Sequence, residues 1–468
     1  VAWDNSWRTG NLVIDDGRDV GNWDAAWIFV KYREAGSVWK HAKLLMGGHE
    51  LGTGTNATIQ VGVPDQNADW HALENPGVGA MVYRSETGSG TFAVEQMKLR
   101  WDYGTDNLDP EAEYILEIYA IEMVSVMPGP YFLGSGGSEE SRFIAGGSST
   151  NEPFLVTSEW NGCISDTEGC LWATGDMDEG GVLQEGYPTG WDGFYVMKYE
   201  ISQQQYVDFL NTLTPEQASE RAYTGGANRN GITQEDGYYV TSRPYVANNY
   251  MSWEDGISYL DWAGLRPLTE LEFEKAARGY ADPVADEYAW GNTELVLAEG
   301  LASAGGRTET VVPESANANG NSSIDGPVRV GVFADATSNR VTSGASYWGV
   351  MELSGNVWER YVTAGNESGR LFSSLHGDGG LTSNGFGNVP LWPGYIDSSL
   401  TNLDGSGFRG GAYTSSSEDI KISSRSNATL TISSRANDSG FRGARSMMRN
   451  DLAILTTTII GNGIISPS

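Results

Sequence analysis

Leu265-Arg-Pro-Leu-Thr-Glu-Leu-Glu-Phe-Glu-Lys-Ala-Ala-Arg-Gly279 is the stretch that most constrains the fold of this chain. Thr269, followed three residues later by Glu272, has the pattern of a capping box, in which each side chain accepts a hydrogen bond from the backbone N–H of the other residue. Gly279 stands where a glycine commonly ends a helix in a left-handed conformation. The spacing predicts a helix that begins after Thr269 and ends before Gly279.

Two more helices are predicted upstream of this stretch. Ser202 followed by Gln205 is a second capping box, and the next apolar residues recur at the spacing of one helical face: Tyr206, Phe209, Leu210 and Leu213. Ser252 is expected to cap the other helix, which runs through Asp261. After residue 280 the chain is rich in Gly, Ser, Asn and Asp and has only short apolar runs, which predicts a loop-rich region.

Residues 1–117 have the pattern of an all-β domain. Runs rich in β-branched and aromatic residues are separated by Gly, Asn, Asp and Pro clusters, and strands at such spacing predict a sandwich. Core packing is the simpler role for the tryptophans of this segment, although such rings also stack on sugars: Trp3, Trp7, Trp23, Trp27, Trp39, Trp70 and Trp101. We expect a β-sandwich over 1–117, a second domain over 118–450 packed against it without a linker, and a β-prone tail over 451–468.

The net charge of the chain argues against some classes of binding partner. The 468 residues include 29 Lys and Arg against 61 Asp and Glu, which gives a formal net charge of −32. A field of this sign repels phosphate and argues against nucleic acid or an anionic membrane as a partner. No run of 18 apolar residues occurs, so no membrane span is expected. The start Val1-Ala2-Trp3, without Met, is interpreted as an exported protein whose signal has been removed, or as an expression boundary.

Cys163 and Cys170 are the two cysteines of the chain. A pair cannot build a cysteine-rich zinc site, and no histidine lies nearby in the sequence. A disulfide closing a small loop is the simplest interpretation, with free thiols or a redox or metal-binding pair as alternatives. A disulfide would suit an extracellular, cell-surface or periplasmic location.

A series of motifs follows the N-terminal segment. In chain order they are Gly193-Phe-Tyr-Val-Met-Lys-Tyr-Glu200, Ser252-Trp-Glu-Asp255, the stretch Leu265 to Gly279, Tyr288-Ala-Trp-Gly-Asn292, Trp348-Gly-Val-Met-Glu-Leu-Ser-Gly-Asn-Val-Trp-Glu359, Phe408-Arg-Gly-Gly411 and Gly440-Phe-Arg442. Together they resemble the formylglycine-generating enzyme (sulfatase-modifying factor) family over about 118–447. The resemblance implies a loop-rich, C-type-lectin-like domain with bound Ca²⁺. Together with the N-terminal all-β sandwich predicted from the strand pattern, it gives an expected α+β chain.

The resemblance also identifies positions where the family's chemistry is missing. Family enzymes oxidise a substrate cysteine with Cu(I) held by two thiolates, because soft Cu(I) needs sulfur ligands. At the matching positions this chain has Ser415 and Ile420, and Ala412 replaces the motif's serine. We therefore expect no copper and no catalytic residues, and the chain is interpreted as a non-catalytic member. A related branch uses a three-histidine iron site, but the four histidines are not arranged for one: His41, His49, His71 and His376.

One calcium motif of the family is retained. The matching ligand positions are Glu352, Gly355, Val357 and Glu359, two carboxylates and two backbone carbonyls on a turn. Hard oxygen ligands of this kind suit Ca²⁺. The departure is Glu352, where the family has a shorter Asp or Asn. The alternative is that Glu352 and Glu359 are solvated or paired with Arg360. A second calcium site would fall in 297–327, where no matching core can be aligned.

Three functions follow as hypotheses. The first is a non-catalytic exported module for surface assembly or ligand binding, in which the tail 451–468 pairs with its own N-terminal segment or with another subunit. The second is a copper-dependent formylglycine-generating oxidase, and the third is a ligand-display protein with hypervariable residues in 413–439. Candidate contacts to a peptide or glycan, expected to meet at one cleft, are His376, Asp378, Trp392, Tyr395, Tyr413 and Glu418.

Overall fold

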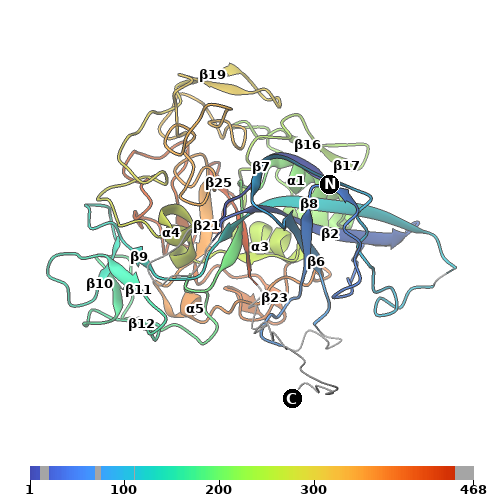
Figure 1. The fold of residues 1–468 in the computed structure, drawn as a ribbon, viewed down its shortest axis with the longest axis horizontal. Coiled ribbons are helices and arrows are strands. Elements are labelled where there is room, and N and C mark those ends of the chain that lie inside the picture. Colours follow the sequence, from blue (N-terminus) through green and yellow to red (C-terminus); the bar gives the residue numbers. More distant parts are fainter. Residues whose placement is uncertain (11–20, 69–74, 110, 448–468) are drawn as a thin grey trace, which may run out of the picture.

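The computed structural model describes residues 1–10, 21–68, 75–109 and 111–447. In this part of the chain, many short strands and a few short helices are joined by long loops (Figure 1). The described helices are α1 (Gln203–Asn211), α2 (Pro215–Arg221), α3 (Trp253–Trp262), α4 (Glu270–Arg278) and α5 (Glu367–Arg370). None of these helices is long and apolar enough to cross a membrane. The expected β-rich chain with few helices is confirmed, and the predicted tail 451–468 lies outside the described residues.

The largest sheet joins the N-terminal segment to the rest of the chain. Its strand order is β18-β26-β15-β8-β2-β6-β5, with β3 beside β2. The strands are β2 (Asp24–Glu34), β3 (Lys40–His41), β5 (Ala57–Gly62), β6 (Gly79–Arg84), β8 (Tyr114–Val126), β15 (Phe194–Met197), β18 (Arg266–Pro267) and β26 (Gly443–Ser446). β8 pairs with β2 from Tyr114 to Val124 and with β15 over its last residues. The expected boundary at 117/118 therefore falls inside a strand that is hydrogen-bonded to both segments.

β2 contributes to two cores because alternate side chains of a strand point to opposite faces. Ala26 and Ile28 pack against a three-stranded sheet made of β1 (Ala2–Arg8), β7 (Gly88–Glu95) and β4 (Thr53–Gly54). Trp27 and Phe29 face the main core, which also contains buried residues of α1 and α3. The indole N–H of Trp27 donates to the carbonyl of Ala263 at 2.7 Å. Because the large sheet is shared with the second segment, the specific sandwich expected for 1–117 is not confirmed.

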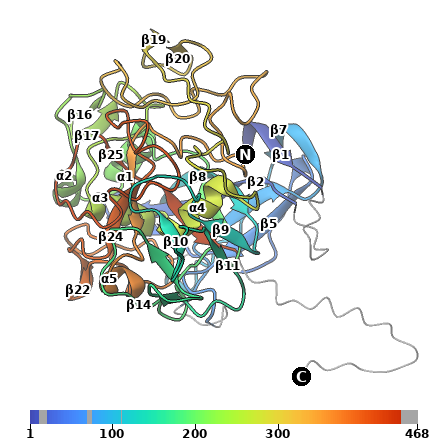
Figure 2. The same ribbon diagram turned by 90° about the vertical axis from the view of Figure 1, so that its left-hand side faces the viewer.

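Small sheets and hairpins make up the rest of the described fold. They are β9 (Tyr131–Leu133) with β11 (Phe154–Val156); β10 (Phe143–Ala145), β13 (Leu171–Ala173), β12 (Cys163–Ile164) and β14 (Gly181–Val182); β16 (Ile232–Glu235) with β17 (Tyr238–Thr241); β19 (Gly300–Ser303) with β20 (Thr310–Val312); β24 (Ser406–Arg409), β21 (Trp358–Val362) and β25 (Ser439–Gly440); and β22 (Tyr395–Ile396) with β23 (Ser399–Leu400). Figure 2 shows the β19–β20 hairpin at the opposite end of the molecule from β14.

The helix boundaries predicted from the capping patterns are confirmed. Ser202 precedes α1 and Thr269 precedes α4, and both capping boxes are formed. α3 begins after Ser252 and ends one residue beyond the expected Asp261. Gly279 follows α4 with φ of 67°, in the left-handed region that glycine adopts without strain. Local hydrogen-bonding patterns were therefore sufficient to locate these helices.

α4 is buried, and its residues Glu270 and Glu274 are paired with arginines from a distant segment. Glu270 accepts from Arg409 at 3.0 Å and from Arg425 at 2.7 Å, and Glu274 accepts from Arg409 at 2.8 Å. Burial acts to raise the pKa of Glu270, but the two guanidinium groups outweigh burial and hold that pKa below its usual value. Because a buried charge is tolerated only when it is paired, these contacts fix the segment 409–425 against α4.

Candidate functional site

The loop that follows β24 contains Ser415 and Ile420, the two positions that the sequence resemblance matched to copper-binding cysteines. Gly410 and Gly411 have φ of 86° and 71°, so the backbone turns through the left-handed region directly after the strand. Beyond this turn, Oγ of Ser415 accepts a hydrogen bond from the backbone N–H of Ala412 at 2.9 Å. Ile420 is fully buried and belongs to the apolar cluster around α4. One position therefore completes a polar turn and the other completes the core, and neither supplies sulfur.

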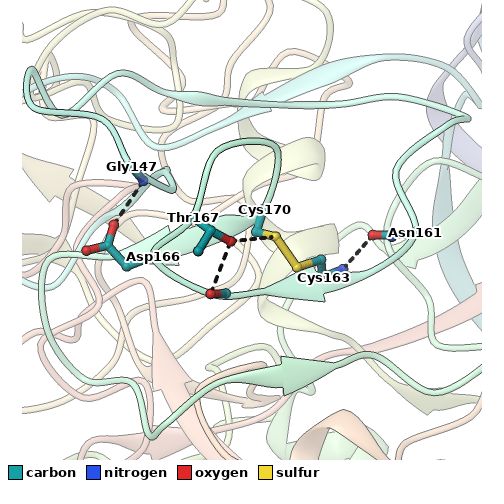
Figure 3. The surroundings of a disulfide bond; sticks show 7 residues. Gly147, Asn161, Cys163, Asp166, Thr167 and Cys170 are labelled. Atoms are coloured by element: carbon teal, nitrogen blue, oxygen red, sulfur yellow. Dashed lines mark hydrogen bonds between the residues drawn. A yellow bond between two sulfur atoms is a disulfide. The ribbon is translucent and has the colours of Figure 1, made fainter.

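The two cysteines are bonded to each other. Cys163 lies in β12 and Cys170 directly precedes β13, with 4.9 Å between their Cα atoms (Figure 3). The Thr167 hydroxyl contacts Sγ of Cys170 at 3.3 Å, and Asn161 accepts from the backbone N–H of Cys163 at 3.1 Å. Since the chain contains two cysteines and both form this disulfide, neither thiol is free to bind a soft metal.

Three of the predicted calcium positions, Glu352, Gly355 and Val357, lie on the turn that leads into β21, and Glu359 lies in that strand. Glu359 is buried, and its carboxylate accepts hydrogen bonds from the guanidinium of Arg442, the shortest at 2.7 Å, and from the Tyr361 hydroxyl at 2.6 Å. The alternative partner Arg360 instead donates to the carbonyl of Ile432 at 2.9 Å. Glu359 is therefore neither solvated nor paired with its neighbour in sequence.

Glu352 and Glu200 add two more buried carboxyl groups to this region. Oε1 of Glu352 accepts from the backbone N–H of Gly331 at 2.8 Å, whereas its buried Oε2 has no hydrogen-bond partner among the described residues. Burial raises the pKa of Glu352 to about 7. Burial and the nearby carboxyls of Glu352 and Glu359 raise the pKa of Glu200 well above its usual value.

The fit of these residues to Ca²⁺ is mixed. The unpaired Oε2 of Glu352 and the backbone turn at Gly355, where φ is 96°, suit a cation site. The carboxylate of Glu359 does not, because Arg442 already neutralises it. No group of three or more His, Cys, Asp or Glu side chains able to hold a metal ion occurs within the described part of the chain. Calcium binding at Glu352, Gly355, Val357 and Glu359 stays a prediction.

The described histidines have separate roles. Nε2 of His41 lies 2.5 Å from the carbonyl of Val78, and Nδ1 of His49 accepts from the backbone N–H of Arg100 at 3.0 Å. His376 is buried, and Nε2 of its ring accepts from the backbone N–H of Ser446 at 2.9 Å. His71 lies outside the described residues. The three described rings are therefore held by the backbone at separate places.

The six residues expected to contact a ligand are used in different ways. Trp392 is buried and its indole N–H donates to the carbonyl of Leu375 at 2.9 Å. The Tyr413 hydroxyl accepts from Nδ2 of Asn437 at 2.9 Å. Two others lie nearer the surface: Tyr395 is half-buried in β22, and Glu418 forms an ion pair with Lys421 at 2.6 Å. Asp378 lines a cavity beside β2, and neither His376 nor these four residues line it.

That cavity is the feature that sequence reasoning missed. Its volume is about 910 Å³, and its walls come from β2, β3, the turn between them, the α1–α2 connection, the end of α3 and the loop after residue 377. Four basic residues between positions 31 and 43 line it, in a chain with a net charge of −32: Lys31, Arg33, Lys40 and Lys43. This local concentration of positive charge was visible in the sequence and was the available signal.

Comparison with known proteins identifies the family. The model of the sulfatase-modifying factor enzyme 1-like domain matches residues 122–447, and the chain belongs to this family. The matched region begins inside β8 and ends directly after β26, so it contains the loop of Ser415 and Ile420 as well as the buried carboxyl groups.

Individual relatives match shorter stretches. A formylglycine-generating enzyme of Thermomonospora curvata is 45% identical over 56 residues, which are 12% of this chain and 18% of the relative. One of Streptomyces coelicolor is 32% identical over 120 residues, which are 26% of this chain and 33% of the relative. The chain thus spans a third or less of the length of these curated relatives. Among solved structures, Treponema denticola variable protein 1 is matched with a TM-score of 0.34 and 11% identity, over 70% of this chain and 96% of that chain.

Proposed function

We propose that this chain is a non-catalytic, exported member of the family that uses the scaffold to bind a ligand or to build a surface assembly. The observation that carries the proposal is the chemistry at Ser415 and Ile420. A hydroxyl engaged in a turn and a buried alkyl group offer Cu(I) no soft ligand. The disulfide between Cys163 and Cys170 leaves the chain without a free thiol, and such a bond is typical of exported proteins.

The frame around positions 415 and 420 is held together by internal ion pairs, which supports the same proposal. Arg409 and Arg425 are buried against α4 by ion pairs that do not depend on a metal. Glu359 is likewise satisfied by Arg442. A scaffold held by internal ion pairs keeps its loop in place without copper, which suits a structural or binding role. Self-association through the tail 451–468 is part of the proposal, although that tail lies outside the described residues.

The test is a direct measurement of copper binding and turnover. The full chain is titrated with Cu(I) against a chromogenic cuprous chelator, and then incubated in air with a Cys-Xaa-Pro-Xaa-Arg peptide that is analysed by mass spectrometry for aldehyde. We expect no stoichiometric binding and no aldehyde. Tight copper binding with aldehyde product would overturn the proposal in favour of the oxidase.

A designed gain of binding provides the matched control. The double variant Ser415→Cys with Ile420→Cys restores sulfur at both positions, whereas each single variant restores one. We expect the double variant to bind Cu(I) more tightly than either single variant, because two thiolates chelate one ion. This result would show that the assay detects copper binding at positions 415 and 420. It would also show that the natural chain fails to bind copper there because it has no thiolates at these positions.

A further inference from the structure

The cavity beside β2 concentrates positive charge on an acidic protein. Four cationic side chains line it and two carboxylates oppose them: Lys31, Arg33, Lys40 and Lys43, against Asp106 and Asp378. In the whole chain, by contrast, acidic residues outnumber Lys and Arg by 61 to 29. A concave surface with charge opposite to that of its surroundings focuses the field on a ligand of the other sign. The cavity therefore favours an anion.

Two of these cations are free of protein anions. Within the described parts of the chain, the side chains of Arg33 and Lys40 make neither an ion pair nor a hydrogen bond, whereas Lys43 lies 3.8 Å from Asp106. The guanidinium of Arg33 lies 4.5 Å from the centre of the Trp39 ring, and this contact holds it at the wall of the cavity. Arg33 is thus positioned but has unused capacity to donate hydrogen bonds.

Buried donors in the same walls lack acceptors. Nε of Arg33 and the indole N–H of Trp262 are both buried, and neither has a hydrogen-bond partner among the described residues. Trp262 is 4% exposed and lines the cavity. An unsatisfied buried donor costs about 1–3 kcal/mol, so these two groups are a local cost to the fold beside the cavity.

Lys31 extends the positive wall into the interior. Its ammonium group donates to the carbonyls of Trp262 at 2.7 Å and Gly379 at 3.0 Å. Burial lowers the pKa of Lys31 to about 7, although the carboxylates of Asp261 and Asp378 act in the opposite direction. The charge on this amine is therefore poorly compensated, and an anion bound in the cavity would stabilise it.

The remaining walls of the cavity are polar, which suits a hydroxylated ligand better than an apolar side chain. Hydroxyl groups of five residues line the cavity: Ser37, Thr105, Thr212, Thr214 and Ser383. The hydroxyls of Ser37 and Ser383 make no hydrogen bond to other described residues. The partly exposed ring of Trp39 offers a flat apolar face of the kind on which a sugar ring stacks.

We propose that this cavity binds an acidic saccharide, that is, a sugar chain carrying carboxylate or sulfate groups, with Arg33 and Lys40 as anion contacts and Trp39 as the stacking surface. The inference rests on the ligand-binding part of the proposed function and names its ligand class. Carboxylated and sulfated sugars share the chemistry that the cavity recognises, and the test below distinguishes them.

Calorimetric titration of the full chain tests the proposal. The probes are an oligogalacturonate, a sulfated oligosaccharide, a neutral malto-oligosaccharide of the same length, a glutamate peptide of the same charge, and inorganic sulfate. We expect one or both acidic sugars to bind, with an affinity that falls as salt is raised. Equal or tighter binding of the neutral sugar, the peptide or inorganic sulfate would overturn the assignment to an acidic saccharide, as would the absence of any binding.

Variants locate the binding to the cavity. The double variant Arg33→Gln with Lys40→Gln should lower the affinity for the acidic sugar at least 10-fold, because two charge-assisted contacts to the sugar are lost. Trp39→Ala should weaken it as well. Lys98→Gln, at an exposed lysine paired with Glu50, and Tyr238→Ala, at an exposed tyrosine, are the matched controls and should bind as the natural chain does. Unchanged affinity in the cavity variants would overturn the site.

The controls also separate this inference from the proposed function. Circular dichroism melts verify that each variant is folded, and Arg33 and Lys40 are suitable because their side chains hold no other part of the structure together. The titration measures no copper binding or aldehyde. A chain that proved to be an oxidase could still bind the sugar, and a chain without oxidase activity could fail to bind it.

Discussion

Arg442 donates three hydrogen bonds to the carboxylate of Glu359, at 2.7 to 3.0 Å, and both side chains are buried. The pairing connects β21 to the segment that precedes β26, 83 residues later. The carboxyl groups of Glu200 and Glu352 are buried close to this pair. The charge of Arg442 is therefore important, because Arg442 is the cation that contacts Glu359 directly.

Replacing Glu359 by alanine should strongly destabilise the fold. The change leaves the guanidinium of Arg442 buried without its carboxylate, and breaking a buried pair in this way costs about 3–5 kcal/mol. Chemical denaturation should be carried out once in Ca²⁺ and once in excess chelator. The ion pair predicts the same loss in both buffers. A loss confined to the calcium buffer would contradict this account and would favour the predicted calcium site.

The imidazole of His376 should remain neutral at pH values where an exposed histidine is protonated. Burial, followed by the charges of Arg445 and Arg266, lowers its pKa well below 6.5. Proton-detected NMR of the ring, assigned with a His376→Asn variant, should show no titration near pH 6.5. A resonance that titrates there in the folded protein would show the prediction to be wrong.

The same histidine should make stability depend on pH. Below pH 6.5 the unfolded chain binds a proton that the folded chain excludes, so the free energy of unfolding falls as the pH falls, until the folded pKa is reached. The slope from one such group approaches about 1.4 kcal/mol per pH unit. His376→Asn should lower stability at pH 8, where the ring accepts from Ser446, and should flatten this slope on the acid side.

Removing the disulfide should have a moderate effect. Cys163 and Cys170 are seven residues apart, and a loop of this size contributes about 2–3 kcal/mol in the chain-entropy model. A reducing agent should therefore lower the melting temperature of the natural chain. The double variant Cys163→Ser with Cys170→Ser should melt at the reduced value with or without the agent. If reduction left the natural melting temperature unchanged, the bond would contribute little.

Gly256 should not tolerate alanine, although alanine favours helices. A Cβ at this position of α3 would lie 1.9 Å from the ring of Phe441, which belongs to the Gly-Phe-Arg motif. Overpacking of this kind costs typically about 1–3 kcal/mol. Gly300→Ala is the matched control, because nothing lies within 4 Å of its Cβ. Melting temperatures of the two variants should differ clearly, and equal values would mean that α3 shifts to accept the methyl group.

The sequence predicted the local features of the fold better than the distant ones. N-cap patterns located α1, α3 and α4, because the hydrogen bonds of a cap join residues three positions apart. The partner of Glu359 was not predictable in this way, since Arg442 is 83 residues away and the neighbouring Arg360 was the natural candidate. The N-terminal strands were recognised as β, but the sequence did not indicate that β8 would place them in a sheet with β15 and β26.

For the candidate site, too, the sequence predicted local features better than contacts between distant residues. The identities of the residues at positions 415 and 420 could be read from the motif alone, and the structure adds the hydrogen bond of Ser415 and the burial of Ile420. The six expected ligand contacts stay a prediction: His376 and Trp392 are buried, and Asp378 lines the cavity beside β2. The cavity was missed because its walls come from segments far apart in the chain, and only the tertiary fold brings Lys31 and Asp378 together.

The strand β8 has a mechanical consequence. It is paired along its length with β2 and at its end with β15, so tension applied between the N-terminal segment and the family domain would load many backbone hydrogen bonds in parallel. Rupture would require them to shear together rather than to open one after another. A link of this kind would transmit pulling forces through the seam between the two segments.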